Sequence, residues 1–289
     1  MKIIILVPIY NDWKSASRLL EEINSKIIGL DCEFSIIIIN DASSEEMPKN
    51  TLNIENIKSI KIINMKENRG HARCIASGLK YIYEKEDFDY VIPMDGDGED
   101  RPEEIKNFIG YLNYTSDQPI VGERVKRSES LLFKFCYNFH KILTFVFTGQ
   151  SIKFGNYTCL PKLTVEKMIN DKALWSSFSG TLTKLEKDRS SVPSIRGTRY
   201  FGPSKMSFKN LIIHSLAIIS VFKLNVLIRS ILFMLVYIFL IHQNISIIML
   251  VPVPLVVLLI VLTFIISKRE NLEELNNSLL NISNIENIK

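Results

Sequence analysis

The sequence predicts an α/β protein whose mostly parallel, Rossmann-like sheet is flanked by helices and followed by segments that enter a membrane. Three observations predict this organisation. Short apolar runs alternate with helix-like stretches over the first 112 residues, polar motifs follow several of these runs, and most of the excess apolar residues lie after residue 210. Strands that are apolar throughout and separated by helices are typical of parallel sheets covered on both faces.

The elements expected in the first part of the chain alternate in type. The N-terminal apolar run ends at Pro8 and no small-residue cleavage site follows it, so it predicts a buried strand and not a signal peptide. Ligands bind at the carboxyl ends of parallel strands, so the motifs after the strands are expected to form one site. The expected strands are residues 2–7, 34–39, 57–63 and 90–94, and the expected helices are residues 17–28, 72–83 and 103–112.

Composition excludes several classes of function. The net charge is only +4 over 289 residues, and the basic residues form no dense stripe with aromatic residues between them, so nucleic acid is not an expected partner. The four cysteines lack paired spacing, which argues against a disulfide framework and for a reducing, cytosolic setting. The four histidines lack ligand spacing, so a histidine-built metal site is not expected either.

Residues 207–222 are apolar at most positions and have lysines on both sides, as expected of a helix that lies in the membrane interface. Residues 226–241 and 245–267 then approach the roughly 20 residues that a bilayer core requires. Lysine and arginine occur at the outer ends of this pair and not in the connector 242–244, which predicts a hairpin with both ends in the cytoplasm. The alternative is two buried helices of a soluble domain, although 23 residues without a charge are difficult to place in so small a core.

The strongest local motif reads DGDGED over residues 95–100 and follows an expected strand. Asp95 and Asp97 can hold a hard divalent ion that also binds phosphate oxygens, and Glu99 is a further candidate ligand. Such an ion offsets the charge on a departing diphosphate. The alternative is a solvated acidic loop. An EF-hand is excluded because Lys106 stands at the twelfth loop position, where that motif requires glutamate.

Three further motifs follow the expected strands: residues 7–11 (VPIYN), 39–44 (INDASS) and 68–73 (NRGHAR). Together with the acidic motif they resemble the N-terminal half of family 2 glycosyltransferases of the GT-A fold, in which the four blocks read approximately VPxYNE, VDDGSxD, NxGxxxAxxxG and MDADxQ. The resemblance covers residues 3–105 and implies a nucleotide-sugar donor together with Mg²⁺ or Mn²⁺.

Most of the donor-binding residues that this resemblance implies come from these four motifs, and Ser204 comes from the second half of the chain. Asp41 can accept hydrogen bonds from a base or ribose, or it is simply a turn aspartate, and Pro8 with Tyr10 can flank the base. Gly70 permits close approach of the backbone to the nucleotide. The donor set is Pro8, Tyr10, Asn11, Asp41, Asn68, Gly70, Asp95 and Ser204.

Two arginines, and two departures from the family pattern, bear on the assignment of a nucleotide site. Arg69 or Arg73 can neutralise phosphate, or both are surface charges at a helix start. Asn40 replaces the first aspartate of the usual pair, and Asp12 stands where the pattern has glutamate. Both retain the capacity to hydrogen-bond, so the nucleotide assignment survives, with the choice between a UDP- and a GDP-sugar left open.

The second half resembles the polyprenyl-phosphate sugar transferases of the dolichyl-phosphate mannose synthase type. Residues 121–124 (VGER) are similar to their GSR element, and residues 199–207 (RYFGPSKMS) to their RxxGxSK element. These motifs would bring hydrogen-bond donors to the membrane surface, where acceptor phosphate and donor diphosphate meet. The alternative is a basic patch attracted to anionic lipid. The residues concerned are Arg124, Arg199, Ser204 and Lys205.

The resulting expectation is a GT-A domain at 1–206, an interfacial helix at 207–223, two transmembrane helices at 224–268 and a polar, Asn-rich cytoplasmic tail at 269–289, expected as a weakly ordered helix. Asp97, Asp95, Arg124, Arg199 and Lys205 form the expected catalytic set.

The expected reaction is an inverting, metal-dependent transfer of a sugar to a membrane polyprenyl phosphate. Transfer to a hydroxyl of a glycolipid or cell-surface polysaccharide is the alternative, and it would require a general base such as Glu186 or Asp188. An inactive membrane scaffold is the alternative from another class. A processive polysaccharide synthase is disfavoured because its QxxRW block is absent. A second copy of the chain is a further candidate partner.

Overall fold

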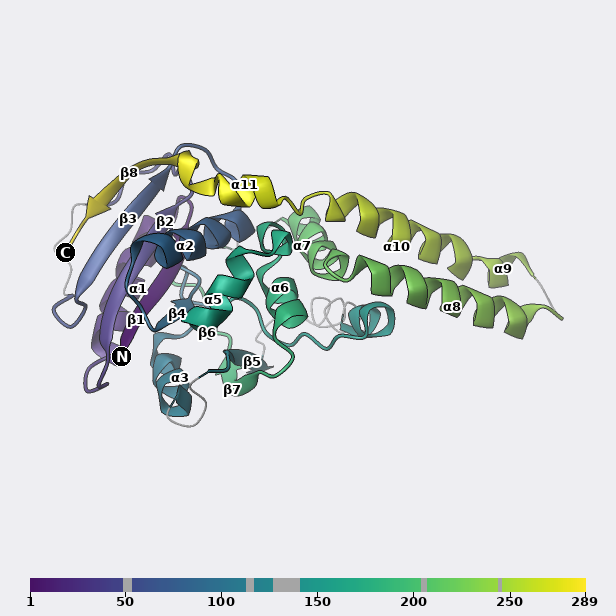
Figure 1. Ribbon diagram of the computed structural model, residues 1–289, viewed down its shortest axis with the longest axis horizontal. Coiled ribbons are helices and arrows are strands. Elements are labelled where there is room, and N and C mark those ends of the chain that lie inside the picture. Colours follow the sequence, from purple (N-terminus) through teal and green to yellow (C-terminus); the bar gives the residue numbers. More distant parts are fainter. Residues whose placement is uncertain (49–53, 113–116, 127–140, 204–206, 244–245) are drawn as a thin grey trace.

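The computed structural model describes residues 1–289 except 49–53, 113–116, 127–140, 204–206 and 244–245 (Figure 1). Its core is a mixed sheet of eight strands in the order β7-β5-β6-β4-β1-β2-β3-β8. The pairs β1–β2, β1–β4, β2–β3 and β5–β7 are parallel, whereas β6 and β8 run antiparallel to their neighbours. The strands are β1 (Lys2–Ile9), β2 (Glu33–Asn40), β3 (Ser59–Met65), β4 (Tyr90–Pro93), β5 (Ile120–Lys126), β6 (Thr158–Pro161), β7 (Ser190–Ile195) and β8 (Ile282–Asn287).

Helices cover both faces of this sheet, as the apolar strands predicted. One hydrophobic cluster joins α1 and α3 to one face, and a second joins α2, α5 and α6 to the other. The mostly parallel α/β sheet is therefore confirmed. The helices of this domain are α1 (Trp13–Lys26), α2 (His71–Lys85), η1 (Pro102–Glu104), α3 (Ile105–Leu112), α5 (Lys162–Ile169), η2 (Lys172–Trp175) and α6 (Phe178–Leu185). A helical stretch at 141–148 instead packs Phe147 against Val226 and Val256 of the C-terminal apolar segment.

The register of the central strands aligns their carboxyl ends. Ile9 pairs with Asn40, and Asn40 pairs with Asn64, so β1, β2 and β3 end at the same level. Pro93 at the end of β4 pairs with Leu6 of β1. The polar motifs that follow these strands consequently meet at one edge of the sheet.

The apolar C-terminal segment forms α7 (Phe208–Ser220) and a long pair of helices that projects away from the sheet in Figure 1. The pair consists of α8 (Lys223–Ile241) and, after the short α9 (Ile247–Leu250), α10 (Pro252–Ser267). Phe239 and Leu240 are each 72% exposed. Among the residues that the structure describes, two helices are by length and composition apolar enough to cross a membrane. The sheet domain does not bury this hairpin, so the alternative of two core helices is wrong.

Replacing residues 224–268 by a short Gly/Ser linker is expected to release most of the protein from membranes without detergent. The two ends of the hairpin already meet, because Lys223 Nζ lies 3.3 Å from Glu270 Oε2, so a short linker can join them. Ultracentrifugation of lysates with and without detergent measures the distribution. A full-length chain that stays in the supernatant without detergent would show that the hairpin is not inserted in a bilayer.

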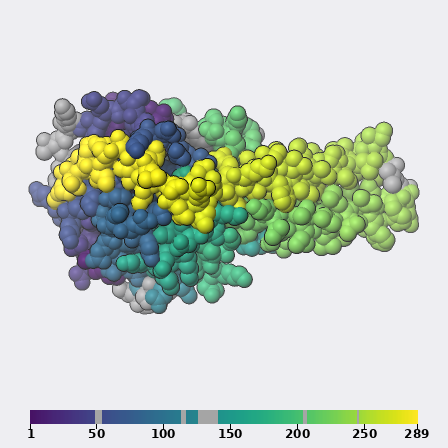
Figure 2. All heavy atoms as spheres, turned by 45° about the horizontal axis from the view of Figure 1, so that its top comes forward, coloured from purple at the N-terminus to yellow at the C-terminus, as the bar shows by residue number. Residues whose placement is uncertain are grey.

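The expectation of a weakly ordered helical tail is wrong. Residues 272–287 instead form α11 (Leu272–Asn276), η3 (Ser278–Asn281) and β8, which pairs antiparallel with β3. In Figure 2 this segment, in yellow, lies along the surface of the domain and continues into α10. The physical reason is that β3 would otherwise be an edge strand with unpaired backbone groups. The division at residue 206 falls in the stretch 204–206, outside the described residues, and stays a prediction.

Candidate functional site

Asp41, at the end of β2, organises the loop that leads into α2. Its carboxylate accepts hydrogen bonds from the backbone N–H groups of Arg69, at 2.9 Å, and Gly70, at 2.8 Å. Gly70 has φ +90°, a conformation that suits glycine. Burial raises the pKa of Asp41, although the two N–H groups oppose this effect. The turn role that the sequence allowed is thus present in the structure, and contact with a base stays a prediction.

The loop after β1 is tied to the loop after β2. Asn11 Oδ1 accepts the N–H of Ser44 at 2.8 Å, and the N–H of Asn11 donates to Ser43 Oγ at 2.9 Å. Asn11 and Ala42 have φ of 50° and 56°, a region that costs energy for residues other than glycine. Of the two residues expected to flank a base, Tyr10 is exposed and Pro8 is buried within β1.

The acidic turn, defined as residues 95–100, follows β4 at the same edge. Asp95 Oδ1 lies 3.3 Å from His71 Nε2, at the start of α2. The N–H of Asp95 donates to Asp100 Oδ2 at 2.9 Å, and the N–H of Glu99 donates to Asp97 Oδ1 at 2.9 Å. These bonds hold the turn in one shape, so the acidic motif is an ordered part of the edge and not a free solvated loop.

The basic segment, defined as residues 196–200, lies directly on the acidic turn. Arg199 bridges two carboxylates: its Nη1 is 2.5 Å from Asp97 Oδ2, and its Nη2 is 2.6 Å from Asp12 Oδ2. The N–H of Tyr200 donates to the carbonyl of Asp97 at 2.9 Å, and Arg196 pairs with Glu99. Two regions about a hundred residues apart in the sequence therefore form one unit.

Burial and mutual repulsion shift the pKa values of the carboxyl groups in the acidic turn. Burial and the charge of Asp95 raise the pKa of Asp97 to about 6, and the same two effects raise the pKa of Asp100 to about 7. Burial opposes ionisation of Asp95, but the charges of His71 and Arg124 hold its pKa below the usual range. Carboxyl groups that raise one another's pKa in this way favour a nearby cation.

The family follows from comparison with known sequences. The sequence model described as "Glycosyl transferase family 2" matches residues 4–174, more than half of the chain. The chain belongs to glycosyl transferase family 2. The expected family is thereby confirmed.

Relatives and solved structures agree with this membership. The chain is 29% identical over 220 residues to an undecaprenyl-phosphate 4-deoxy-4-formamido-L-arabinose transferase of Proteus mirabilis, and 25% identical over 219 residues to the Klebsiella pneumoniae protein of the same name. Each match covers 73% of the chain, and the chain spans 64% of the length of these relatives.

Two crystal structures share the GT-A fold with this family 2 member. S. aureus TarS 1-349 in complex with UDP-GlcNAc has a TM-score of 0.51 and 15% identity, and the match covers 80% of this chain and 70% of the other. Glucosyl-3-phosphoglycerate synthase from Mycobacterium tuberculosis, in complex with Mn²⁺, UDP and phosphoglyceric acid, has a TM-score of 0.55 and 11% identity, and covers 78% of both chains. At such identities the likeness shows the fold alone.

The carboxylates of the acidic turn have the chemistry to hold a divalent ion. Within the described part of the chain, Asp95 Oδ1 is buried and lies 3.3 Å from His71 Nε2. Among those same residues, no group of three or more Asp, Glu, His or Cys side chains is arranged to hold an ion by itself. Mg²⁺ commonly uses only one or two carboxylates, because phosphates and water supply its other ligands. Glu99, the third expected ligand, is occupied by Arg196.

The arginines that were expected near phosphate make different contacts in the structure. Arg124, on β5, packs its guanidinium against Gly155, where a Cβ would lie 2.8 Å from Nη2. Arg73 lies 5.3 Å over the ring of Trp175 and 3.9 Å from Glu274, so it points to the C-terminal tail. Arg69 pairs with Glu67 on the surface, at 3.3 Å. Ser204 and Lys205 lie outside the described residues, and Asn68 is exposed.

Sequence reasoning gave no site role to His71, Arg196 and Asp12. His71 belongs to the motif at residues 68–73, which follows β3, and Asp95 follows β4. Because the carboxyl ends of these strands meet at one edge of the sheet, the sequence could have indicated that the two residues lie close together. The pairing of Asp12 with Arg199 spans 187 positions and left no local signal. Glu186, one of the two candidate general bases, accepts from Lys167 Nζ at 2.9 Å and so joins α5 to α6.

Gly98→Ala is expected to destabilise the protein by about 1–3 kcal/mol. Gly98 has φ +87°, and an added Cβ would lie 2.5 Å from the ring of Tyr200, so the substitution would strain the turn and push the basic segment away. Gly110→Ala is the matched control, because a Cβ there has open space within helix α3 and alanine favours helix by about 1 kcal/mol. Urea unfolding in detergent measures both. Equal stability of the two variants would contradict the close packing of Tyr200 on Gly98.

Proposed function

We propose that the chain is a membrane-anchored glycosyltransferase that moves a sugar from a UDP- or GDP-sugar to a polyprenyl phosphate. One observation carries the proposal. The carboxylate of Asp97 lies 2.5 Å from the guanidinium of Arg199, whose segment comes shortly before the apolar hairpin in the chain. A site for a diphosphate is therefore next to the segment that would meet a lipid phosphate. The relatives named as undecaprenyl-phosphate sugar transferases support the same acceptor class.

The proposed reaction is a single displacement. A phosphate oxygen of the acceptor attacks the anomeric carbon and forms the new C–O bond, while the bond from that carbon to the diphosphate oxygen breaks. The electron pair of the broken bond leaves with the nucleoside diphosphate. Attack opposite to the leaving group inverts the anomeric configuration. A lipid phosphate is already ionised at neutral pH, so this acceptor requires no general base.

The residues of this chain would bind and orient the two phosphates. Asp95 and Asp97 would hold Mg²⁺ or Mn²⁺, and Glu99 could join them only after release of Arg196. When bound, the ion supplies Lewis-acid stabilisation of the departing diphosphate. Arg199 is well suited to phosphate because a guanidinium donates two parallel hydrogen bonds to it. Arg124 would add positive charge near Asp95, and Lys205 and Ser204 would meet the acceptor phosphate.

The donor would lie along the edge formed by Asn11, Asp41 and Gly70. The UDP complexes of the two structural neighbours support a uridine donor, and GDP stays the alternative. The excess of lysine and arginine at the outer ends of the hairpin favours a catalytic domain in the cytoplasm.

The test is transfer of labelled sugar into lipid. Membranes that contain the protein are incubated with a panel of UDP- and GDP-sugars plus undecaprenyl phosphate, and the label in the organic phase is counted. Undecaprenol, which lacks the phosphate, is the matched acceptor control. Label that enters lipid with the phosphate and not with the alcohol supports the proposal. Label found on a hydroxyl of a glycolipid or polysaccharide would show that the acceptor is a hydroxyl and not a lipid phosphate. Absence of transfer from every donor would favour an inactive membrane scaffold.

A further inference from the structure

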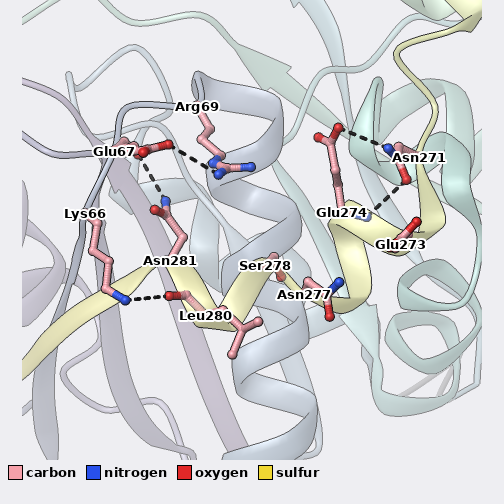
Figure 3. A pocket seen from close by; sticks show the side chains of 10 residues that line it. All are labelled: Lys66, Glu67, Arg69, Asn271, Glu273, Glu274, Asn277, Ser278, Leu280 and Asn281. Carbon is pink, nitrogen blue, oxygen red and sulfur yellow. Dashed lines mark hydrogen bonds and ion pairs between the residues drawn. The ribbon is translucent and has the colours of Figure 1, made fainter.

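The C-terminal tail, defined as residues 271–289, returns from the hairpin and runs beside the loop that precedes α2. This loop, residues 66–70, carries the two N–H groups that Asp41 holds. A cavity of about 540 Å³ lies between tail and loop, lined mostly by polar and charged side chains (Figure 3). Leu275 of the tail is buried in the core and β8 pairs with β3. Across the cavity itself, hydrogen bonds join the tail to the loop.

Asn281 makes the most direct connection. Its side-chain Nδ2 donates to the carbonyl of Glu67 at 3.1 Å, and its own carbonyl accepts the N–H of Lys66 at 2.7 Å. Lys66 Nζ also donates to the carbonyl of Leu280 at 2.8 Å. Asn281 is only 8% exposed, so its amide is a buried group that holds the loop three residues before Gly70.

A second connection runs along the strand ends. Glu286 of β8 accepts from Asn64 Nδ2 at 2.6 Å, and Asn64 Oδ1 accepts from Asn40 Nδ2 at 2.8 Å. Asn40 Oδ1 in turn accepts the N–H of Ser43 at 3.0 Å, and Ser43 Oγ accepts the N–H of Asn11. This chain of hydrogen bonds thus links the tail to the loop after β2 and, through Ser43, to the loop after β1.

The hairpin end of the tail is also fixed. Glu270, just after α10, pairs with Lys223 at the start of α8. Glu274 Oε2 in α11 accepts from Trp175 Nε1 at 2.6 Å. The tail is therefore attached to the helix pair at one end and to the donor edge at the other.

We propose that the C-terminal tail positions the donor-binding loop of the transferase, with Asn281 as the positioning residue. This inference rests on the proposed function, because it assumes that residues 66–70 bind a nucleotide. Asn281 does not touch the reacting atoms. It holds the carbonyl of Glu67 so that the Gly70 backbone stays where Asp41 fixes it, and loss of this bond is expected to weaken donor binding and to leave acceptor binding unchanged.

The experiment compares two alanine substitutions on the same tail in the full-length, detergent-solubilised protein. Asn281→Ala is expected to raise KM for the nucleotide-sugar about three- to tenfold, the effect of one hydrogen bond, with kcat and KM for undecaprenyl phosphate close to wild type. Asn277→Ala is the matched control, because Asn277 is exposed and has no hydrogen bond to the loop within the described residues. A chain that ends at Glu270 is expected to lose more donor affinity and still to pellet with membranes.

Binding of UDP and of GDP, measured by calorimetry, separates the two proposals. A wild-type protein that binds neither nucleotide and transfers no sugar would refute the proposed function. A wild-type protein that is active, together with an Asn281→Ala variant whose donor KM equals that of wild type, would refute the positioning role alone. A fall in kcat at unchanged donor KM, with a lowered melting temperature, would show a merely structural role and would also refute it.

Discussion

Asp97→Asn is expected to lower kcat for sugar transfer about 10²–10³-fold, the usual effect of removing one group that stabilises developing charge. The side chain keeps its shape and loses the negative charge that would bind the ion beside the diphosphate. Folding is expected to survive. Burial and Asp95 raise the pKa of Asp97 to about 6, so its contribution to stability is fully present below the unfolded pKa and is lost as pH rises through about 6. An uncharged asparagine therefore costs little stability at pH 7.

Transfer into undecaprenyl phosphate at saturating Mn²⁺, together with thermal unfolding, measures this effect. Asp31→Asn is the matched control, because Asp31 is exposed and lies just before β2, at the opposite edge of the sheet. Turnover of Asp97→Asn that is unchanged at saturating Mn²⁺ would show that Asp97 does not bind an ion needed for transfer. A fall in turnover no larger than that of Asp31→Asn would show the same.

Arg199→Ala is expected to lower transfer about 10²-fold and, in the absence of nucleotide, to tighten Mn²⁺ binding about tenfold. The two effects have opposite signs because Arg199 would interact with Asp97 in the absence of ligand and with the diphosphate when the donor is bound. It neutralises Asp97 at 2.5 Å in the absence of ligand, so it competes with a cation for that carboxylate. With donor bound, its guanidinium would stabilise the diphosphate.

Mn²⁺ titration followed by electron paramagnetic resonance, with transfer assays on the same preparations, checks both parts. Arg199→Lys is the companion variant. One ammonium cannot span Asp12 and Asp97 as the planar guanidinium does, so we expect lysine to restore less than half of the lost activity. If Arg199→Ala weakens Mn²⁺ binding, the ion pair with Asp97 supports the metal site instead of competing with it, and the assignment is wrong.

Most of the sheet could be predicted from sequence because its signals are local. The strands β1 to β4 are continuous apolar runs bounded by turn residues, and burial on both faces requires such runs. The hairpin was predictable for a similar reason, since the length of an apolar helix and the charges at its ends are read directly from the residues. The acidic turn and the three other motifs could also be found, because each stands directly after a strand.

The tertiary structure decided what depends on distant pairing. Residues 282–287 alternate too weakly to indicate a strand, and they become β8 only because the edge of β3 needs a partner. Arg199 meets Asp12 across 187 positions, and Asn281 meets Glu67 across 214. The sequence by itself thus determined strands β1 to β4, the polar motifs that follow them, and where the chain becomes apolar. Only the folded chain determined which charges neutralise one another and which segment contacts the loop before α2, because those contacts depend on tertiary packing and on no periodic or local pattern.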